Sequence, residues 1–193
     1  MSVADAEHSM ITVSSTTDAN QSKGRRMHLH FPINQISMEA HYYNVNVTWN
    51  KDRQGLMCSP ELRQNGIENS CIEVATPPQF PKGIPGIWSP EHLFTAAVSS
   101  CLMTTFLSIA ENSKLNFKSF QCNSSGKLDQ TDGKLQMTEV KVEPVLVIAD
   151  ENDRERAMRV LLKTESACLI TNSIKAHVIM KPTIKTETIA EMA

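Results

Sequence analysis

The stretch from Leu93 to Ala110 contains no charged residue, and it constrains the fold of this chain more than any other segment. It is nearly long enough to cross a membrane as a helix. Hydroxyl side chains recur along it, however, which favours a buried helix of a soluble protein over a membrane span. These side chains belong to Thr95, Ser99, Ser100, Thr104, Thr105 and Ser108.

The residues before this stretch predict where the helix begins. Ser89 is a residue type that caps helices well, and Pro90 fits the first helical position. Glu91 places a negative charge in the first turn, where the helix dipole favours it. We therefore expect the helix to begin after Ser89 and to run to about Ser113.

Apolar residues cover nearly the whole circumference of this helix rather than one stripe. Such a helix must be enclosed on every side. In a domain of this size a sheet can cover one face, and the simplest cover for the other face is a second copy of the protein. The sequence therefore predicts a homodimer.

The remaining patterns predict an α+β fold. Residues 1–36 are rich in Ser and Thr without a sustained period, so we expect a flexible extension before a single domain over residues 37–193. In that domain, alternating patterns predict a largely antiparallel sheet, and a second helix begins near Asp150 or Asn152. The expected strands cover 41–50, 56–59, 71–75, two or three segments of 117–148, and 174–180.

Composition disfavours several partners and cofactors. The chain has 19 basic and 21 acidic residues, hence no basic excess for binding nucleic acid. The five cysteines form no C-x-x-C pair, and the close histidines, His28 and His30, lie in the expected extension, so we expect no bound metal. The odd number of cysteines argues against structural disulfides, and no apolar signal core occurs in residues 1–36, which together predict a cytoplasmic protein.

Two cysteines lie on the two predicted helices and are the candidates for chemistry. Cys101 and Cys168 each have a structural interpretation, because free cysteine is among the most buried residue types. As a pair they can do more: one thiolate attacks an oxidant and becomes a sulfenic acid, and the other condenses with it to a disulfide. Cys58, Cys71 and Cys122 fall in expected strands, and we interpret them as structural.

Activation of a buried thiol requires a cation, and arginine suits this because it stays charged when desolvated. Arg53, in a predicted turn, and Arg63 are the candidates, and Glu91 could hold the guanidinium of Arg53. Glu91 and Cys101, however, are about 15 Å apart along a straight helix. Antiparallel packing of two such helices across a twofold axis would bring them together, and a kink in the helix is the alternative.

Three motifs resemble the OsmC/Ohr family of osmotically inducible and organic hydroperoxide resistance proteins over about residues 40–182. Arg53, Gln54 and Gly55 resemble the early R-D-G turn of that family. A second motif, a Cys followed by a small hydroxyl residue and Asn, is matched by Cys168, Thr171 and Asn172. The signature P-E-x-L-[FL]-x-A-A followed by Cys is matched by Pro90, Glu91, Leu93, Phe94, Ala96, Ala97 and Cys101.

The resemblance implies an OsmC-like fold, in which mostly antiparallel sheets wrap long central helices in an intertwined homodimer. It also implies a thiol peroxidase for organic hydroperoxides, with Cys101 as the peroxidatic thiol and Cys168 as the resolving thiol. Arg53 and Glu91 would polarise the site. No cofactor would be bound, and an external dithiol of the lipoyl type would serve as reductant, without nucleic acid or membrane partners.

Two positions depart from the family pattern. Leu169 stands where many members have Pro, and Glu165 stands where many have His. Because Glu165 lies one helical turn before Cys168, we expect its charge to disfavour a thiolate there.

Two alternative functions use the same residues differently. In a binding protein, the dimer would hold an apolar ligand and the cysteines would only pack. In a redox sensor, the disulfide would alter a partner contact without sustained turnover.

Overall fold

The structure, a computed structural model, describes residues 40–64 and 67–186. The expected extension over residues 1–36, including His28 and His30, lies outside the described residues. The elements described below belong to one compact unit that begins at Tyr42. They form two sheets and two α-helices, as expected for an α+β fold.

The first sheet is antiparallel, in the order β1-β2-β3, and consists of β1 (Asn46–Lys51), β2 (Gln54–Gln64) and β3 (Ile67–Ala75). At the β1–β2 turn, the carbonyl of Arg53 accepts a hydrogen bond of 3.0 Å from the backbone N–H of Thr76. The end of β3 is thereby joined to the turn that carries Arg53.

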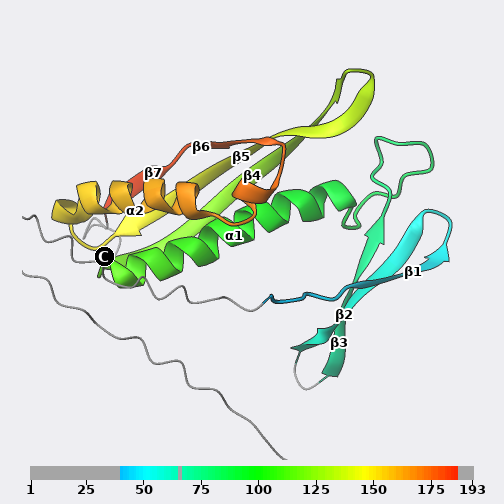
Figure 1. Ribbon diagram of the computed structural model, residues 1–193, viewed down its shortest axis with the longest axis horizontal. Helices are drawn as coiled ribbons and strands as arrows, with labels where there is room; N and C mark the ends of the chain where they lie inside the picture. Colours follow the sequence, from blue (N-terminus) through cyan, green and yellow to red (C-terminus); the bar gives the residue numbers. More distant parts are fainter. Residues whose placement is uncertain (1–39, 65–66, 187–193) are drawn as a thin grey trace, which may run out of the picture. The chain divides into compact units, whose positions relative to one another are not determined.

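The second sheet is built around a long hairpin of β4 (Phe117–Thr131) and β5 (Lys134–Ile148) (Figure 1). Asp132 and Gly133 close the hairpin with φ values of 52° and 75°, the left-handed conformation that a two-residue turn of this kind requires. Two short strands pair in parallel with β5. They are β6 (His177–Met180) and β7 (Thr183–Thr186).

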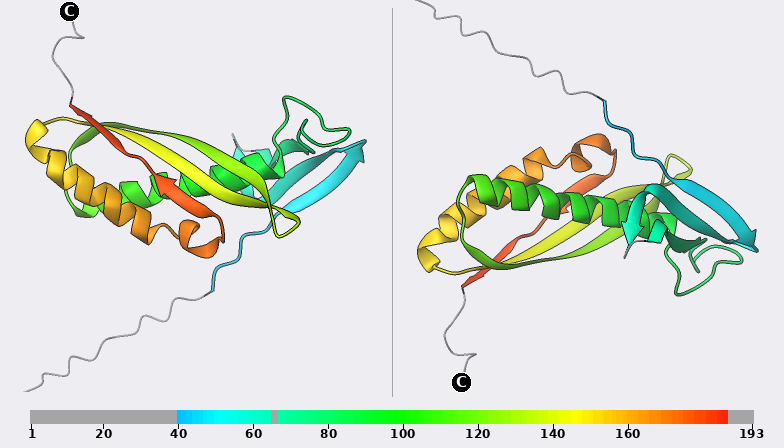
Figure 2. Two further views of the ribbon diagram at one scale, coloured as in Figure 1. Left: turned by 90° about the horizontal axis from the view of Figure 1, so that it is seen from above. Right: turned by 90° about the horizontal axis from the view of Figure 1, so that it is seen from below.

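Two α-helices, α1 (Pro90–Asn112) and α2 (Arg154–Ala167), lie on the same side of the second sheet (Figure 2). Every second residue of β5 from Val140 to Ile148 is buried beneath them. Phe106 of α1 stacks on Phe120 of β4 with ring centroids 4.6 Å apart, and Leu161 of α2 joins the same core cluster. Short 3-10 helices flank α2, namely η1 (Glu151–Asp153) and η2 (Thr171–Ser173).

The predicted start of α1 is confirmed. The Ser89 side chain accepts a hydrogen bond from the backbone N–H of His92, and the His92 ring accepts one from the backbone N–H of Ser89. In the described part of the chain, α1 is the helix long and apolar enough to span a membrane by length and composition. It packs here against β4, β5 and α2, while Met103 and Leu107 are 40% and 43% exposed.

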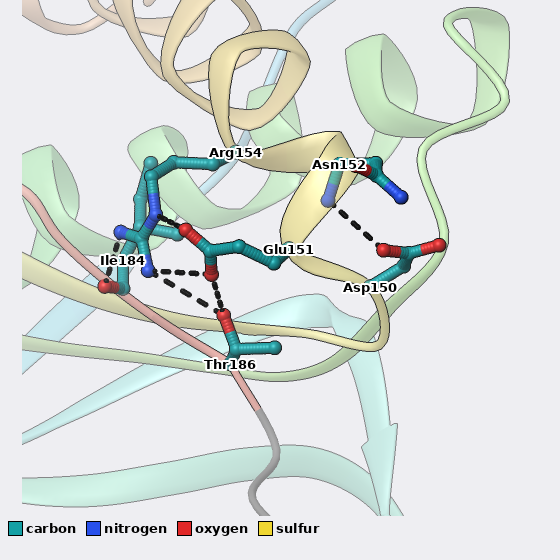
Figure 3. A network of polar contacts seen from close by, with 6 residues as sticks. All are labelled: Asp150, Glu151, Asn152, Arg154, Ile184 and Thr186. Atoms are coloured by element: carbon teal, nitrogen blue, oxygen red, sulfur yellow. Dashed lines mark hydrogen bonds and ion pairs between the residues drawn. The ribbon is translucent and has the colours of Figure 1, made fainter.

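A polar network fastens β7 to the start of α2 (Figure 3). The Arg154 guanidinium pairs with Glu151 and donates a hydrogen bond of 2.9 Å to the carbonyl of Ile184 in β7. The Thr186 hydroxyl also donates to Glu151. These hydrogen bonds from Arg154 and Thr186 lower the pKa of Glu151 to about 2.

The strand predicted over residues 41–50 is only partly correct. β1 begins at Asn46, and the face expected to be half-buried is exposed in the single chain. Trp49 is 72% exposed and Val47 is 65% exposed, because no described part of the chain packs over this face.

In the second sheet, two predictions differ from the structure. The expected closing strand over residues 174–180 is the shorter β6, which is followed by β7, and both run parallel to β5, so that the sheet is mixed. The apolar pattern along β5 also predicts that Leu135 points inward with Met137, Val140 and Val142. Leu135 is instead 60% exposed, because it lies directly after the hairpin turn at the end of the sheet.

The expectation that the chain has no structural disulfide is wrong. Cys58 of β2 and Cys71 of β3 form a disulfide, with their Cα atoms 4.2 Å apart. The antiparallel register places these two residues directly opposite each other, which their separation in sequence does not indicate.

The disulfide is expected to stabilise the first sheet by restricting the unfolded chain. A cross-link that closes a loop of this length contributes about 3 kcal/mol to the free energy of unfolding. The substitution Cys58→Ser should therefore lower this free energy by about 3 kcal/mol in urea titrations without reductant. Reductant should lower the stability of the wild type and of Cys122→Ser equally, and should leave Cys58→Ser unchanged. Equal stability of the wild type with and without reductant would show that the bond is absent.

Candidate active site

Cys101 lies in the middle of α1, and its half-buried sulfur contacts the turn that follows α2. The backbone N–H of Ile170 in this turn lies 3.5 Å from Cys101 Sγ. On α1 itself, one turn further on, the Thr105 hydroxyl lies 3.9 Å from the same sulfur. The thiol is therefore surrounded by hydrogen-bond donors.

Cys168 is the C-terminal cap of α2 and is fully buried. Its thiol lies close enough to Cys101 for each to shift the pKa of the other, and two residues further on the Ile170 N–H lies 3.5 Å from Cys101 Sγ. The structure thus brings together the two cysteines that the sequence singled out, through the packing of α1 against α2.

The two thiols differ in acidity. Burial raises the pKa of the Cys101 thiol, but hydrogen bonds outweigh this effect, and the net pKa is lowered. Burial also raises the pKa of Cys168, and the neighbouring Cys101 raises it further. The donors that lower the pKa of Cys101 are the Ile170 N–H, the Cys168 thiol, the Thr105 hydroxyl and the Leu169 N–H.

This difference in acidity suits the two thiols to different chemical roles. Cys101 is the thiol more readily deprotonated and hence the better nucleophile, whereas Cys168 stays protonated and donates to it. The expected direction for Cys168 is correct, but burial and the neighbouring Cys101 are the leading causes that raise its pKa, and Glu165 is not among them.

Arg53 and Glu91 do not meet each other or Cys101 within the described part of the single chain. Arg53 is exposed in the β1–β2 turn. Glu91 lies in the first turn of α1, and its buried Oε2 atom has no hydrogen-bond partner. Because α1 is continuous, Glu91 stays about 15 Å from Cys101 along the axis, and no break in the helix brings them together. The side chain of Arg63 is outside what the structure describes.

A cavity of about 620 Å³ lies beside the first turns of α1, and Glu91 is one of the residues that line it. It has an apolar side with Trp88 and Leu128, and a hydroxyl side where Ser124 donates a hydrogen bond of 3.0 Å to Ser99. Cys101 does not line it. No residue pattern in the sequence indicates this cavity, because its walls come from three separate segments, namely the loop before α1, α1 itself and β4.

Two other candidates have ordinary structural roles. Cys122 is half-buried in β4, where its thiol contacts the Ser124 hydroxyl at 3.5 Å, as expected of a structural cysteine. His92 is exposed and caps α1 through Ser89, although it also borders the cavity. In residues 40–64 and 67–186, no group of three His, Cys, Asp or Glu side chains is arranged to hold a metal ion.

Comparison with known proteins identifies the family. The profile of the OsmC-like proteins matches residues 83–183, which contain α1, both site cysteines and the second sheet as far as the start of β7. This chain therefore belongs to the OsmC-like protein family.

Individual relatives support the same fold. The uncharacterised protein YmaD of Bacillus subtilis is 26% identical over 93 residues, which are 47% of this chain and 62% of that protein, so the match spans less than two thirds of the relative. An OsmC-like protein of unknown function from Vibrio cholerae superposes with a TM-score of 0.64 at 24% identity, covering 74% of this chain and 99% of that one. The organic hydroperoxide resistance protein OhrB of Bacillus subtilis superposes with a TM-score of 0.51 at 18% identity, covering 75% and 98%.

The difference in acidity predicts an order of thiol modification. When the protein is treated with iodoacetamide and analysed by peptide mass spectrometry, Cys101 should react at a lower pH than Cys168. The reason is that hydrogen-bond donors outweigh burial at Cys101, whereas burial prevails at Cys168. Alkylation of Cys168 before Cys101 would contradict this description of the site.

Proposed function

We propose that this protein is a thiol peroxidase that reduces organic hydroperoxides to alcohols and so protects the cell from oxidative stress. The observation that carries the proposal is the contact between Cys101 and Cys168, in which the pKa of Cys101 is lowered and that of its neighbour is raised. Relatives of the same fold that are named organic hydroperoxide resistance proteins agree with this activity.

The proposed reaction proceeds in two steps. The Cys101 thiolate attacks the terminal oxygen of the hydroperoxide, the O–O bond breaks, and the alkoxide leaves and takes up a proton to become the alcohol. Cys101 is then a sulfenic acid. The Cys168 sulfur attacks the Cys101 sulfur, its proton leaves with the hydroxyl group as water, and a disulfide forms. An external dithiol reduces the disulfide by thiol exchange.

Arg53 and Glu91 complete the proposed site across a homodimer. Arg53 pairs with the Cys101 thiolate and positions the peroxide, and Glu91 holds the guanidinium. Two observations support a second copy: the unpartnered buried oxygen of Glu91, and the exposed apolar side chains of β1 and α1. Antiparallel packing of two α1 helices would bring Glu91 of one chain toward Cys101 of the other.

The remaining parts of the proposal concern the substrate, the reductant and the place of action. Phe94 is partly buried about two turns before Cys101 on the same face of α1, and it packs in one apolar cluster with Ile170. Its burial against an alkyl group, at about 25 cal/mol per Å², favours an alkyl hydroperoxide over hydrogen peroxide. The reductant is a dithiol of the lipoyl type, and no cofactor is bound. The protein acts in the cytoplasm, where the Cys58–Cys71 disulfide would be an exception, because thiols there are usually kept reduced.

Turnover of cumene hydroperoxide with dihydrolipoamide tests the proposal directly. Cys101→Ser and Cys168→Ser should each abolish sustained turnover, because one removes the nucleophile and the other the resolving thiol. Cys122→Ser is the matched control and should retain the wild-type rate, since this thiol has no role in the reaction. Hydrogen peroxide should be consumed more slowly than the organic substrate.

The alternative functions give different results in this assay. Equal and negligible turnover in all four proteins would reject the peroxidase. If the wild type then formed the Cys101–Cys168 disulfide without continued consumption, the protein would be a sensor. If it formed no disulfide, it would be a binding protein.

The shared site can be tested by mixing two inactive subunits. Glu91→Ala and Cys101→Ser homodimers should each have low activity. Random exchange of subunits should restore about a quarter of the wild-type activity, because half of the dimers are mixed and each of these has one complete site. No recovery after verified exchange would show that Glu91 acts within its own chain.

A further inference from the structure

The turn that follows α2 presents main-chain donors to the Cys101 sulfur. Cys168 ends α2, and the next residues, Leu169 and Ile170, lead into η2. The Ile170 N–H lies 3.5 Å from Cys101 Sγ, within the usual limit for a hydrogen bond to sulfur. A backbone donor of this kind is already oriented before any substrate arrives, as are the donors of an oxyanion hole.

Hydrogen bonds within the turn fix the direction of these donors. The backbone N–H of Asn172 donates to the carbonyl of Cys168 at 3.1 Å. The side-chain amide of Asn172 donates to the carbonyl of Ser166, in the last turn of α2, at 3.0 Å. The Ser173 hydroxyl donates to the carbonyl of Leu169 at 2.8 Å. Asn172 thus joins the turn to the helix that precedes it.

Among the described residues, the leading causes of the lowered pKa of Cys101 are hydrogen bonds from uncharged groups of α1 and of the turn after α2. These groups are the Ile170 and Leu169 N–H, the Thr105 hydroxyl and the Cys168 thiol. The lowered pKa of Cys101 in the single chain therefore comes from uncharged donors.

We propose that the turn of residues 168–171 activates Cys101 through its backbone N–H groups, and that Asn172 is the residue that positions them. The inference deepens the proposed peroxidase and rests on it for its role in turnover. Arg53 then adds to the stabilisation of the thiolate and positions the peroxide, while the turn supplies the donors that are in place within the single chain. Because the same turn carries Cys168, the group that prepares the nucleophile also brings the thiol that resolves it.

A matched pair of substitutions tests the donor at position 170. Ile170→Pro and Ile170→Ala both remove the isoleucine side chain, but only proline removes the N–H. The φ of Ile170 is −66°, which a proline ring adopts without strain. The pH midpoint of Cys101 alkylation, followed by peptide mass spectrometry, should be about one unit higher in Ile170→Pro than in Ile170→Ala.

A second pair keeps the test valid if Ile170→Pro does not fold. Leu169 is 69% exposed, so its side chain is replaced without loss of core packing. Cys168 before it has an extended backbone, with φ −65° and ψ 113°, which a following proline accepts. The pH midpoint of Cys101 alkylation should be higher in Leu169→Pro than in Leu169→Ala, because only the proline variant lacks the backbone N–H at this position.

The role of Asn172 must be tested with a measurement that a general loss of stability would not change. The pH midpoint of Cys101 alkylation, compared with that of Cys122, is such a measurement. Asn172→Ala should raise the midpoint for Cys101 and leave that for Cys122 unchanged. Asn172→Gln, which keeps an amide donor, should restore part of the shift. Arg53→Ala should lower turnover and raise the midpoint by less than either proline variant does, because Arg53 adds to the stabilisation of the thiolate and is not its main source.

The inference would be overturned if, in both pairs, the proline variant and the alanine variant had the same pH midpoint of Cys101 alkylation. So would a larger shift in Arg53→Ala than in either proline variant, because activation would then come from the arginine. The alkylation assay contains no peroxide, so the two proposals fail separately. Absent turnover with the expected shift rejects the peroxidase alone, and normal turnover without the shift rejects the role of the turn.

Discussion

The enclosure of α1 is the constraint on which the rest of the structure depends. An uncharged helix of this length must be covered, and the chain covers part of it with β4, β5 and α2. Val98, Leu102, Phe106 and Ala110 recur every four residues and are buried in this packing. Cys101 precedes Leu102 directly, so the same packing holds its sulfur against the turn after α2.

Much of this arrangement could be predicted from the sequence because it depends on local rules. The cap at Ser89, the left-handed turn at Asp132 and Gly133, and the two apolar helices each follow from residue type and spacing. The meeting of Cys101 with Cys168 follows from the sharing of one core by two helices.

Other features could not be predicted because they depend on register or on the backbone. The Cys58–Cys71 disulfide depends on strands that pair in one register out of several. The Ile170 donor is a backbone N–H, which every residue except proline has, so no residue type indicates it. β7 lacks a marked alternation of apolar residues, and it is fastened by Arg154 from another element.

The single chain leaves features that a second copy would explain. Among the described residues of the single chain, none donates to the buried oxygen of Glu91 and none covers the apolar face of β1. Burial of an unpaired carboxylate is costly, so a cation at this position would remove a penalty in addition to forming a contact. In the proposed dimer that cation is Arg53, while the two cysteines and the donors around them come from one chain.

The central claim is that Cys101 and Cys168 form one redox unit, and the products of a single oxidation test it most directly. Wild-type protein would be treated with one equivalent of cumene hydroperoxide, digested without reductant, and analysed by mass spectrometry. The account predicts one disulfide-linked pair of peptides that joins Cys101 to Cys168, with Cys122 still a free thiol. A sulfinic or sulfonic acid at Cys101 without this linkage, or oxidation of Cys122 instead, would contradict it.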